Sequence, residues 1–283
     1  MPECLKPLRT VSTRKVTSLP LDIKKRKIGS GSYNIVFDAT IKKTYKNKKC
    51  SDSGKKVVLR RTKDYLDSKS SFAQEIKMCI KMAEAGAGPE IYGSGTDEKN
   101  RGFMILEHFP NSLRNLMDRK IKPKWETIEK SLKIPLKKMA KAEIFCSDLK
   151  FRNVVVLEKN NKLTCKLIDF GDDFCAWQED IVIPKKYLTG IKSSPNMPEV
   201  LYAAMLMLMS INSEKHRKMA KAKKPLFHED VKKIPLQTRV LALIIISHAT
   251  SRNGTMAKPI AQARHYYKGR LKDSDSIYKA IIT

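Results

Sequence analysis

The chain has 283 residues, of which 41% are hydrophobic and 30% are charged. This size and composition fit one large domain or two lobes, and they exclude a fibrous repeat or a wholly disordered chain. The 57 Lys and Arg residues against 29 Asp and Glu residues give a formal net charge of +28, which predicts nonspecific affinity for polyanions such as nucleic acid. No apolar stretch approaches the ~20 residues that span a bilayer, so no membrane span is expected.

The six cysteines are scattered along the chain and form no C-x-x-C pair, and no histidine stands at zinc-ligand spacing. Nothing at the N-terminus resembles a secretory leader. The sequence therefore predicts reduced thiols in an intracellular protein, either cytoplasmic or nuclear.

The first half of the chain changes character twice. Residues 1–20 are basic and rich in Ser, Thr and Pro, which predicts a mobile arm. Residues 21–107 alternate short β-rich runs with glycines, and one helix is expected over residues 70–85. Its apolar face would carry Phe72, Ile76, Cys79, Ile80 and Ala83. These patterns predict a small sheet with a single helix.

The second half is mainly helical from residue 112 onward, with apolar residues recurring at helical spacing. A β-hairpin interrupts it, with strands over residues 153–158 and 163–168 and two consecutive asparagines in the turn. The apolar stretches 201–209 and 240–246 are expected to be buried helices. The predicted fold class is therefore α+β.

A glycine pair precedes one of the β-rich runs, in the segment Ile28-Gly29-Ser30-Gly31-Ser32-Tyr33-Asn34-Ile35-Val36. Two glycines two residues apart let backbone amides approach phosphate oxygens without obstruction by side chains. The same pair between two strands is typical of an ordinary hairpin turn. This segment alone leaves both interpretations open.

A second segment carries Asp148, Lys150 and Asn153 on a loop that leads into a strand. An aspartate there can accept the proton of a hydroxyl nucleophile, a lysine can neutralise a transferring phosphoryl group, and an asparagine can hold a metal ion. The alternative is an Asp-initiated turn whose basic side chains face solvent.

The third segment is Asp169-Phe170-Gly171, directly after the second strand of the predicted hairpin. A carboxylate at a strand end is well placed to hold Mg²⁺ on nucleotide phosphates, although Asp-Phe-Gly by itself is an ordinary turn. The order of the three segments, with a hairpin joining the second to the third, is far more specific than any one of them.

In this order the segments resemble the motif set of the eukaryotic protein kinase superfamily, over residues 28–199. The resemblance implies a bilobal protein-kinase-like fold that holds ATP between its lobes. The β-rich N-lobe would cover residues 21–107, and the hinge and helical C-lobe residues 108–283. The compact, lysine-rich chain is similar to kinases of large DNA viruses, which would place it in a host cell.

The resemblance also implies roles for individual residues. Asp148 would be the catalytic base, with Lys150 beside it favouring Ser/Thr over Tyr substrates. Asn153 and Asp169 would bind Mg²⁺ or Mn²⁺. The ATP site would have three parts. The glycine-rich loop would contribute Gly29, Ser30, Gly31, Ser32 and Val36. Arg60 would stand at the position of the ATP-positioning lysine with Glu75 as its partner, and Glu107 and Phe109 would belong to the hinge.

Two departures from the motif set matter for function. The position of the ATP-positioning lysine holds Arg60, although Lys56 or Lys63 could substitute, and arginine does not replace lysine without consequence. Ser147 stands where the family usually has the arginine that binds a phosphorylated activation loop. We therefore expect activity that does not depend on phosphorylation of that loop.

Three functions are compatible with these residues. The first is a kinase that transfers the γ-phosphate of ATP to Ser or Thr hydroxyls of protein substrates. The second is a pseudokinase scaffold that binds nucleotide or a partner without turnover, which the arginine at position 60 favours. The third, a nucleic-acid-binding module, depends on the +28 charge alone, since no nucleic-acid-reading motif accompanies it.

Overall fold

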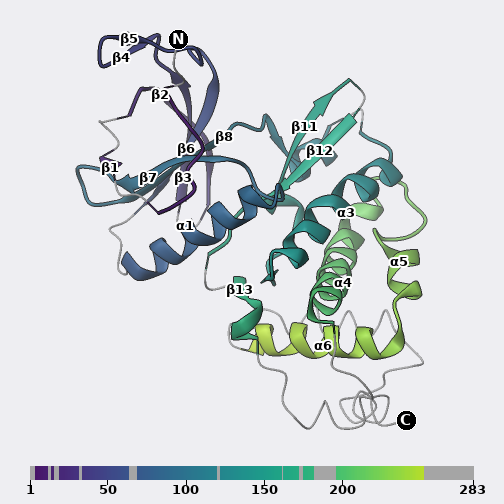
Figure 1. Cartoon of the computed structure of the whole chain (residues 1–283). Helices are drawn as coiled ribbons and strands as arrows, with labels where there is room; N and C mark the ends of the chain where they lie inside the picture. The colour runs from purple at the N-terminus through teal and green to yellow at the C-terminus, as the bar shows by residue number, and fades with distance from the viewer. Residues whose placement is uncertain are drawn as a thin grey trace. The chain divides into compact units, whose positions relative to one another are not determined.

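A computed structural model describes residues 4–11, 14–15, 19–31, 34–63, 69–119, 122–160, 162–171, 175–181 and 196–251. The chain divides into two compact units, Met1–Pro110 and Asn111–Thr283. Unit 1 contains a largely antiparallel sheet and one helix, whereas unit 2 is mainly helical with short strands (Figure 1). The mixed α+β class predicted from the sequence is confirmed.

The sheet of unit 1 has six strands in the order β1-β7-β8-β6-β3-β2. All neighbours are antiparallel except β1 and β7, which are parallel. A small hairpin, β4 (Thr44–Tyr45) and β5 (Lys48–Lys49), is inserted between β3 and β6. The strands of the sheet are β1 (Arg14–Lys15), β2 (Leu21–Ser30), β3 (Asn34–Ile41), β6 (Lys56–Thr62), β7 (Ile91–Thr96) and β8 (Gly102–Glu107).

The two faces of this sheet differ because side chains alternate along each strand. One face buries an apolar cluster that includes Phe37 of β3, Leu59 of β6 and Ile105 of β8. On the other face Arg60 contacts Glu75 of α1 (Lys69–Glu84), so this face carries the helix. The predicted apolar stripe of α1 is buried or half-buried at every position, as helical spacing requires.

The N-terminal segment belongs to unit 1, so the mobile arm expected over residues 1–20 is wrong for the described part of that segment. Leu5 and Leu19 are only 3% and 4% exposed and join the apolar cluster on the sheet. The Leu8 amide donates to the Ile91 carbonyl at 2.6 Å, and β1 extends the sheet edge beside β7. Leu5 and Leu19 belong to no helical or strand-like pattern of apolar residues, which is why the sequence did not indicate this packing.

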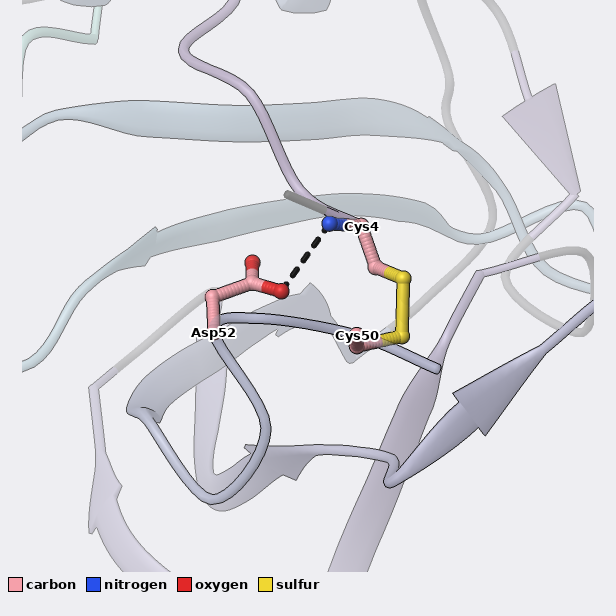
Figure 2. A group of neighbouring side chains, drawn as sticks. All are labelled: Cys4, Cys50 and Asp52. Atoms are coloured by element: carbon pink, nitrogen blue, oxygen red, sulfur yellow. Dashed lines mark hydrogen bonds between the residues drawn. A yellow bond between two sulfur atoms is a disulfide. The ribbon is translucent and has the colours of Figure 1, made fainter. Parts of the chain in front are cut away.

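A disulfide joins Cys4 to Cys50, so the prediction of reduced thiols is wrong for these two residues (Figure 2). They are 46 residues apart in the sequence, and only the packing of the N-terminal segment on the sheet brings them together. The other four cysteines, Cys79, Cys146, Cys165 and Cys175, form no disulfide and are buried. Burial raises the pKa of the Cys165 thiol to about 12, which leaves it protonated and unreactive at neutral pH.

Unit 2 is built on α2 (Leu113–Met117), α3 (Trp125–Lys141), α4 (Met197–Arg217), α5 (His228–Lys233) and α6 (Leu236–Ser251). Its short strands form two small sheets, ordered β12-β11-β9 and β10-β13. These strands are β9 (Asn111–Ser112), β10 (Ile144–Cys146), β11 (Val154–Lys159), β12 (Lys162–Leu167) and β13 (Cys175–Trp177). The β11–β12 hairpin lies within one residue of the two strands predicted from the sequence.

The helices of unit 2 bury the apolar positions that the sequence marked. Ile128, Leu132 and Leu136 of α3 recur every four residues and are fully buried. Both apolar stretches, 201–209 and 240–246, lie within buried helices, α4 and α6. Within the described ranges, no helix has the length and apolar character needed to cross a membrane.

The disulfide supplies the first testable prediction. Replacing both Cys4 and Cys50 by Ser should lower the free energy of unfolding of unit 1 by about 3 to 4 kcal/mol, because the bond closes a long loop in the unfolded chain. Hydrogen exchange at the amides of β6 and β8 measures this change directly. Tryptophan fluorescence would report on unit 2 instead, because Trp125 and Trp177 both lie there.

A reductant provides the control for this experiment. It should accelerate exchange in the wild-type chain to the level of the double variant, and it should leave the variant unchanged. Equal protection in the wild-type chain with and without reductant would show that the bond does not stabilise the sheet.

Candidate functional site

The predicted phosphate-binding loop of unit 1 is the turn between β2 and β3. Gly29 pairs with Val36 and Ser30 with Ile35, and the Gly31 amide donates to the Asn34 carbonyl at 2.9 Å. The hairpin interpretation of this segment is therefore correct, although a hairpin is also compatible with phosphate binding. Ser32 lies outside the described residues.

Local packing does not explain why Gly29 and Gly31 are glycines. Neither has the positive φ that favours glycine. A Cβ at Gly31 would meet nothing within 4 Å, and one at Gly29 would make an ordinary contact with the Val36 Cβ at 3.6 Å. Unhindered backbone at both positions suits a ligand that approaches the main chain closely.

Strand register places three of the predicted ATP-site residues in one row across the sheet. Gly29 of β2 pairs with Val36 of β3, and Val36 pairs with Arg60 of β6. Directly opposed residues project from the same face, so the Val36 and Arg60 side chains are neighbours on the face that carries α1. Met104 of β8 continues the row beyond Arg60.

Arg60 forms an ion pair with Glu75 across that face. Arg60 Nη1 lies 2.7 Å from Glu75 Oε1, and the two side chains are 15% and 10% exposed. The contact is electrostatic, because no described residue donates a well-oriented hydrogen bond to Glu75 Oε1. Arg60, rather than the exposed Lys56, is thus the cation that the structure brings to Glu75.

The predicted hinge residues follow at the end of β8. The Glu107 amide donates to the Glu90 carbonyl at 2.8 Å, and the Glu107 carboxylate accepts the Glu90 amide at 3.2 Å. That Glu107 amide is consequently not available to a ligand. His108 Nε2 lies 3.5 Å from Asp38 Oδ1, and Phe109 is half-buried beside it in the sequence.

In unit 2, the loop after β10 brings Asp148, Lys150 and Asn153 together. Asp148 Oδ2 accepts hydrogen bonds from Lys150 Nζ at 2.5 Å and from Asn153 Nδ2 at 3.0 Å. Asn153 Nδ2 also lies 3.0 Å from the Asp148 carbonyl, to which it donates. Both side-chain contacts of Asp148 use Oδ2, so among the described residues Oδ1 has no donor and is free to accept a proton from a ligand.

Three residues that the sequence did not indicate hold this loop in place. Asn212 of α4 donates to the Leu149 carbonyl at 2.7 Å. The buried ring of His216 stacks on Phe151 with centroids 4.3 Å apart, and Arg114 Nη1 lies 3.2 Å from His216 Nδ1. Because these contacts span more than 60 residues of sequence, no local pattern could have revealed them.

Asp169 follows β12 and is connected to Asn153 through the backbone. The Ile168 amide donates to the Asn153 carbonyl at 3.0 Å. Asp169 is exposed and has φ +72, a left-handed conformation that a non-glycine residue adopts at a cost of about 1 to 2 kcal/mol. Phe170 beside it is buried, with 2% of its surface exposed.

The donor atoms of Asn153 and Asp169 suit a hard divalent cation. The Asn153 amide directs Nδ2 to Asp148, which leaves its Oδ1 as the atom that a metal could bind. An amide oxygen and a carboxylate are ligands that Mg²⁺ accepts. A second cluster, Cys4, Cys50 and Asp52, does not suit a metal, because the disulfide occupies both sulfur atoms.

Comparison with known proteins adds no further constraint. No protein-family model matches the chain, and no curated protein matches it. Function is therefore inferred from the residues and their geometry.

The Arg60–Glu75 pair supplies the second prediction. A double-mutant cycle with Arg60→Met and Glu75→Gln should give a coupling free energy of about 1 to 3 kcal/mol, because the pair is largely shielded from water. Hydrogen exchange of the unit 1 sheet gives the unfolding free energies.

The exposed ion pair between Arg9 and Glu90, with 3.0 Å between its charged atoms, is the matched control. Its coupling free energy should fall between about 0 and 1 kcal/mol. Equal coupling in the two pairs would contradict a special role for the burial of Arg60 and Glu75.

Proposed function

We propose that the protein is a serine/threonine protein kinase that transfers the γ-phosphate of ATP to hydroxyl groups of protein substrates. The observation that carries the proposal is the arrangement around Asp148. One of its carboxylate oxygens is fixed by Lys150 and Asn153, and the other is free. A carboxylate oriented in this way can accept the proton of an incoming hydroxyl as the oxygen attacks phosphorus.

Lys150 has a second role in the proposed reaction. Its ammonium group lies at Oδ2 of Asp148, which leaves Oδ1 for the substrate hydroxyl, and its side chain is 39% exposed. A cation beside the catalytic base can neutralise charge on the phosphoryl group during transfer. Asp148 and Lys150 then supply the base and the electrostatic stabilisation from one loop.

Unit 1 would hold the nucleotide. The glycine hairpin leaves the backbone at Gly29 and Gly31 open to close approach by the phosphates, and Arg60 lies one strand away from Val36 on the α1 face. Glu75 orients the guanidinium, as the proposal requires of a phosphate-positioning cation. The proposal further requires the bilobal kinase arrangement, in which the residues of both units act on one ATP.

Asn153 and Asp169 would hold Mg²⁺ or Mn²⁺ through their side-chain oxygens. When bound, the metal would supply positive charge to the β- and γ-phosphates. The backbone link between Ile168 and Asn153 keeps the two ligand-bearing segments adjacent. This link supports a common metal site, because its two ligands would otherwise come from independent loops.

The arginine at position 60 favours a second candidate, a pseudokinase that binds nucleotide without turnover. A planar guanidinium differs from a lysine ammonium in length, hydration and hydrogen-bonding geometry. If Arg60 binds phosphates but positions them poorly, nucleotide binding persists while transfer fails. Retention of Asp148, Asn153 and Asp169 argues for catalysis, because a scaffold has no chemical need for all three.

Transfer of label from radioactive ATP to a mixture of acceptor proteins, with Mg²⁺ or Mn²⁺, tests the kinase. Asp148→Asn should lower the rate about 10²- to 10⁴-fold, because the general base is lost. Arg60→Ala should lower it about 10²-fold, whereas Arg60→Lys should stay within about tenfold of the wild type, because a cation remains opposite Glu75. Arg152→Ala, an exposed neighbour on the same loop, is the control and should keep its activity.

Thermal stabilisation by ATP and metal separates the two candidates. A kinase binds nucleotide in both the wild-type chain and Asp148→Asn, and only the wild type transfers label. Stabilisation of the wild type with no transfer above the Asp148→Asn background would establish the pseudokinase instead.

A further prediction concerns regulation. Ser147 is buried directly before Asp148. Because this position holds serine and not arginine, it offers no positive charge to bind a phosphorylated activation loop. Phosphatase treatment of the purified enzyme should therefore leave the transfer rate unchanged. Loss of activity on this treatment, with recovery after rephosphorylation between residues 172 and 196, would contradict the prediction.

A further inference from the structure

The segment from the end of β3 to the first residue of β6, residues 42–56, concentrates positive charge on one part of unit 1. It contains seven lysines and a single acidic residue, Asp52. We call it the lysine platform, and its lysines are Lys42, Lys43, Lys46, Lys48, Lys49, Lys55 and Lys56. All seven are exposed. The platform includes the β4–β5 hairpin, which lies at one end of unit 1 (Figure 1).

Five of the seven lysines carry positive charge that no ion pair neutralises within the part of the chain that the structure describes. No carboxylate among those residues forms an ion pair with Lys42, Lys43, Lys46, Lys48 or Lys49. Lys46 also has φ +49 at the tip of the hairpin, followed by Asn47 at +61. Such a turn favours Asn or Gly at its first position, so local structure does not explain a lysine there.

Asp52, the one acid of the platform, faces the N-terminal segment. Its two carboxylate oxygens accept the backbone amides of Cys4 and Leu5, at 2.9 and 3.1 Å. Figure 2 shows the carboxylate directed to the Cys4 nitrogen, beside the disulfide between Cys4 and Cys50. Two further backbone bonds, from the Cys50 amide to the Lys43 carbonyl and from the Gly54 amide to the Ile41 carbonyl, shape the segment. These contacts fix the backbone that carries the lysines, which reduces the backbone conformational entropy lost on binding.

We propose that the lysine platform binds the phosphodiester backbone of duplex nucleic acid without reading its sequence. Lysine ammonium groups act as compact point charges that suit phosphate oxygens, whereas base reading relies on side chains placed in a groove. The only aromatic residue of the platform, Tyr45, is half-buried, so the platform lacks the stacking surface that single strands require.

Two other polyanions fit the platform less well. A membrane surface is usually bound by basic residues together with exposed apolar side chains, and no large hydrophobic residue is exposed between residues 42 and 56. An acidic protein would be expected to meet aromatic or arginine anchors, which are the residues that dominate protein interfaces, and this segment contains no arginine. A regular array of phosphates needs only the exposed ammonium groups that are present.

The test compares two variants of equal charge by fluorescence anisotropy with a short labelled DNA duplex. The platform variant carries Lys43→Gln, Lys46→Gln, Lys48→Gln and Lys49→Gln. The control carries Lys130→Gln, Lys137→Gln, Lys138→Gln and Lys141→Gln, four exposed lysines of α3 in unit 2. Each substitution set removes four charges from the formal +28, which leaves +24 in both variants.

The platform variant should bind the duplex at least ~100-fold more weakly at low salt, and the slope of log K against log salt should decrease by about 3 to 4, because about four phosphate contacts are lost. The α3 variant should change affinity by less than about threefold. Duplexes of unrelated sequence should bind the wild-type chain equally well. Circular dichroism and an intact Cys4–Cys50 bond establish that both variants are folded.

Three results would overturn the proposal. Equal weakening in the two variants would assign binding to net charge and not to the platform. Strong preference for one duplex sequence would contradict backbone recognition. Absence of duplex binding, with binding instead to polyglutamate or to phosphatidylserine vesicles, would identify an acidic protein or a membrane as the ligand. None of these measurements involves phosphoryl transfer, so they are independent of the proposed kinase activity.

Discussion

Alternation of side chains along the strands of unit 1 is the constraint on which its two surfaces depend. Leu59 and Arg60 are consecutive on β6, so the apolar side chain enters the core only if the arginine faces α1. A slip of one residue would exchange them, and burial of an unpaired guanidinium would oppose the slip. The apolar cluster on one face therefore maintains the register that brings Arg60 to Glu75 on the other.

The same cluster also organises the N-terminal segment and the lysine platform. Leu5 and Leu19 complete the apolar face, and this packing brings Cys4 within bonding distance of Cys50. The disulfide and the Asp52 carboxylate then connect the platform to residues at the start of the chain. One face of the sheet thus supports the proposed nucleic-acid site and the other face the proposed nucleotide site, and a change in the core would affect both.

Features set by short-range sequence were predictable, and those set by distant contacts were not. The helix α1, the β11–β12 hairpin and the buried stripe of α3 follow from apolar spacing within a few residues. Asp148 and Asn153 could be selected as candidates because they belong to one six-residue loop. The disulfide, the packing of Leu5 and the stacking of His216 on Phe151 depend on residues far apart in the sequence, which have no periodic signature.

Two locally unfavourable features coincide with residues of the proposed site. The largely buried Arg60–Glu75 pair incurs a desolvation cost, and apolar residues of similar volume often stabilise a protein as well as such a pair does. Asp169 holds a left-handed backbone conformation in which glycine would be less strained. Folding alone would favour replacement at each position. One residue supplies a cation and the other a carboxylate, which are the groups that the proposed phosphate and metal sites would require.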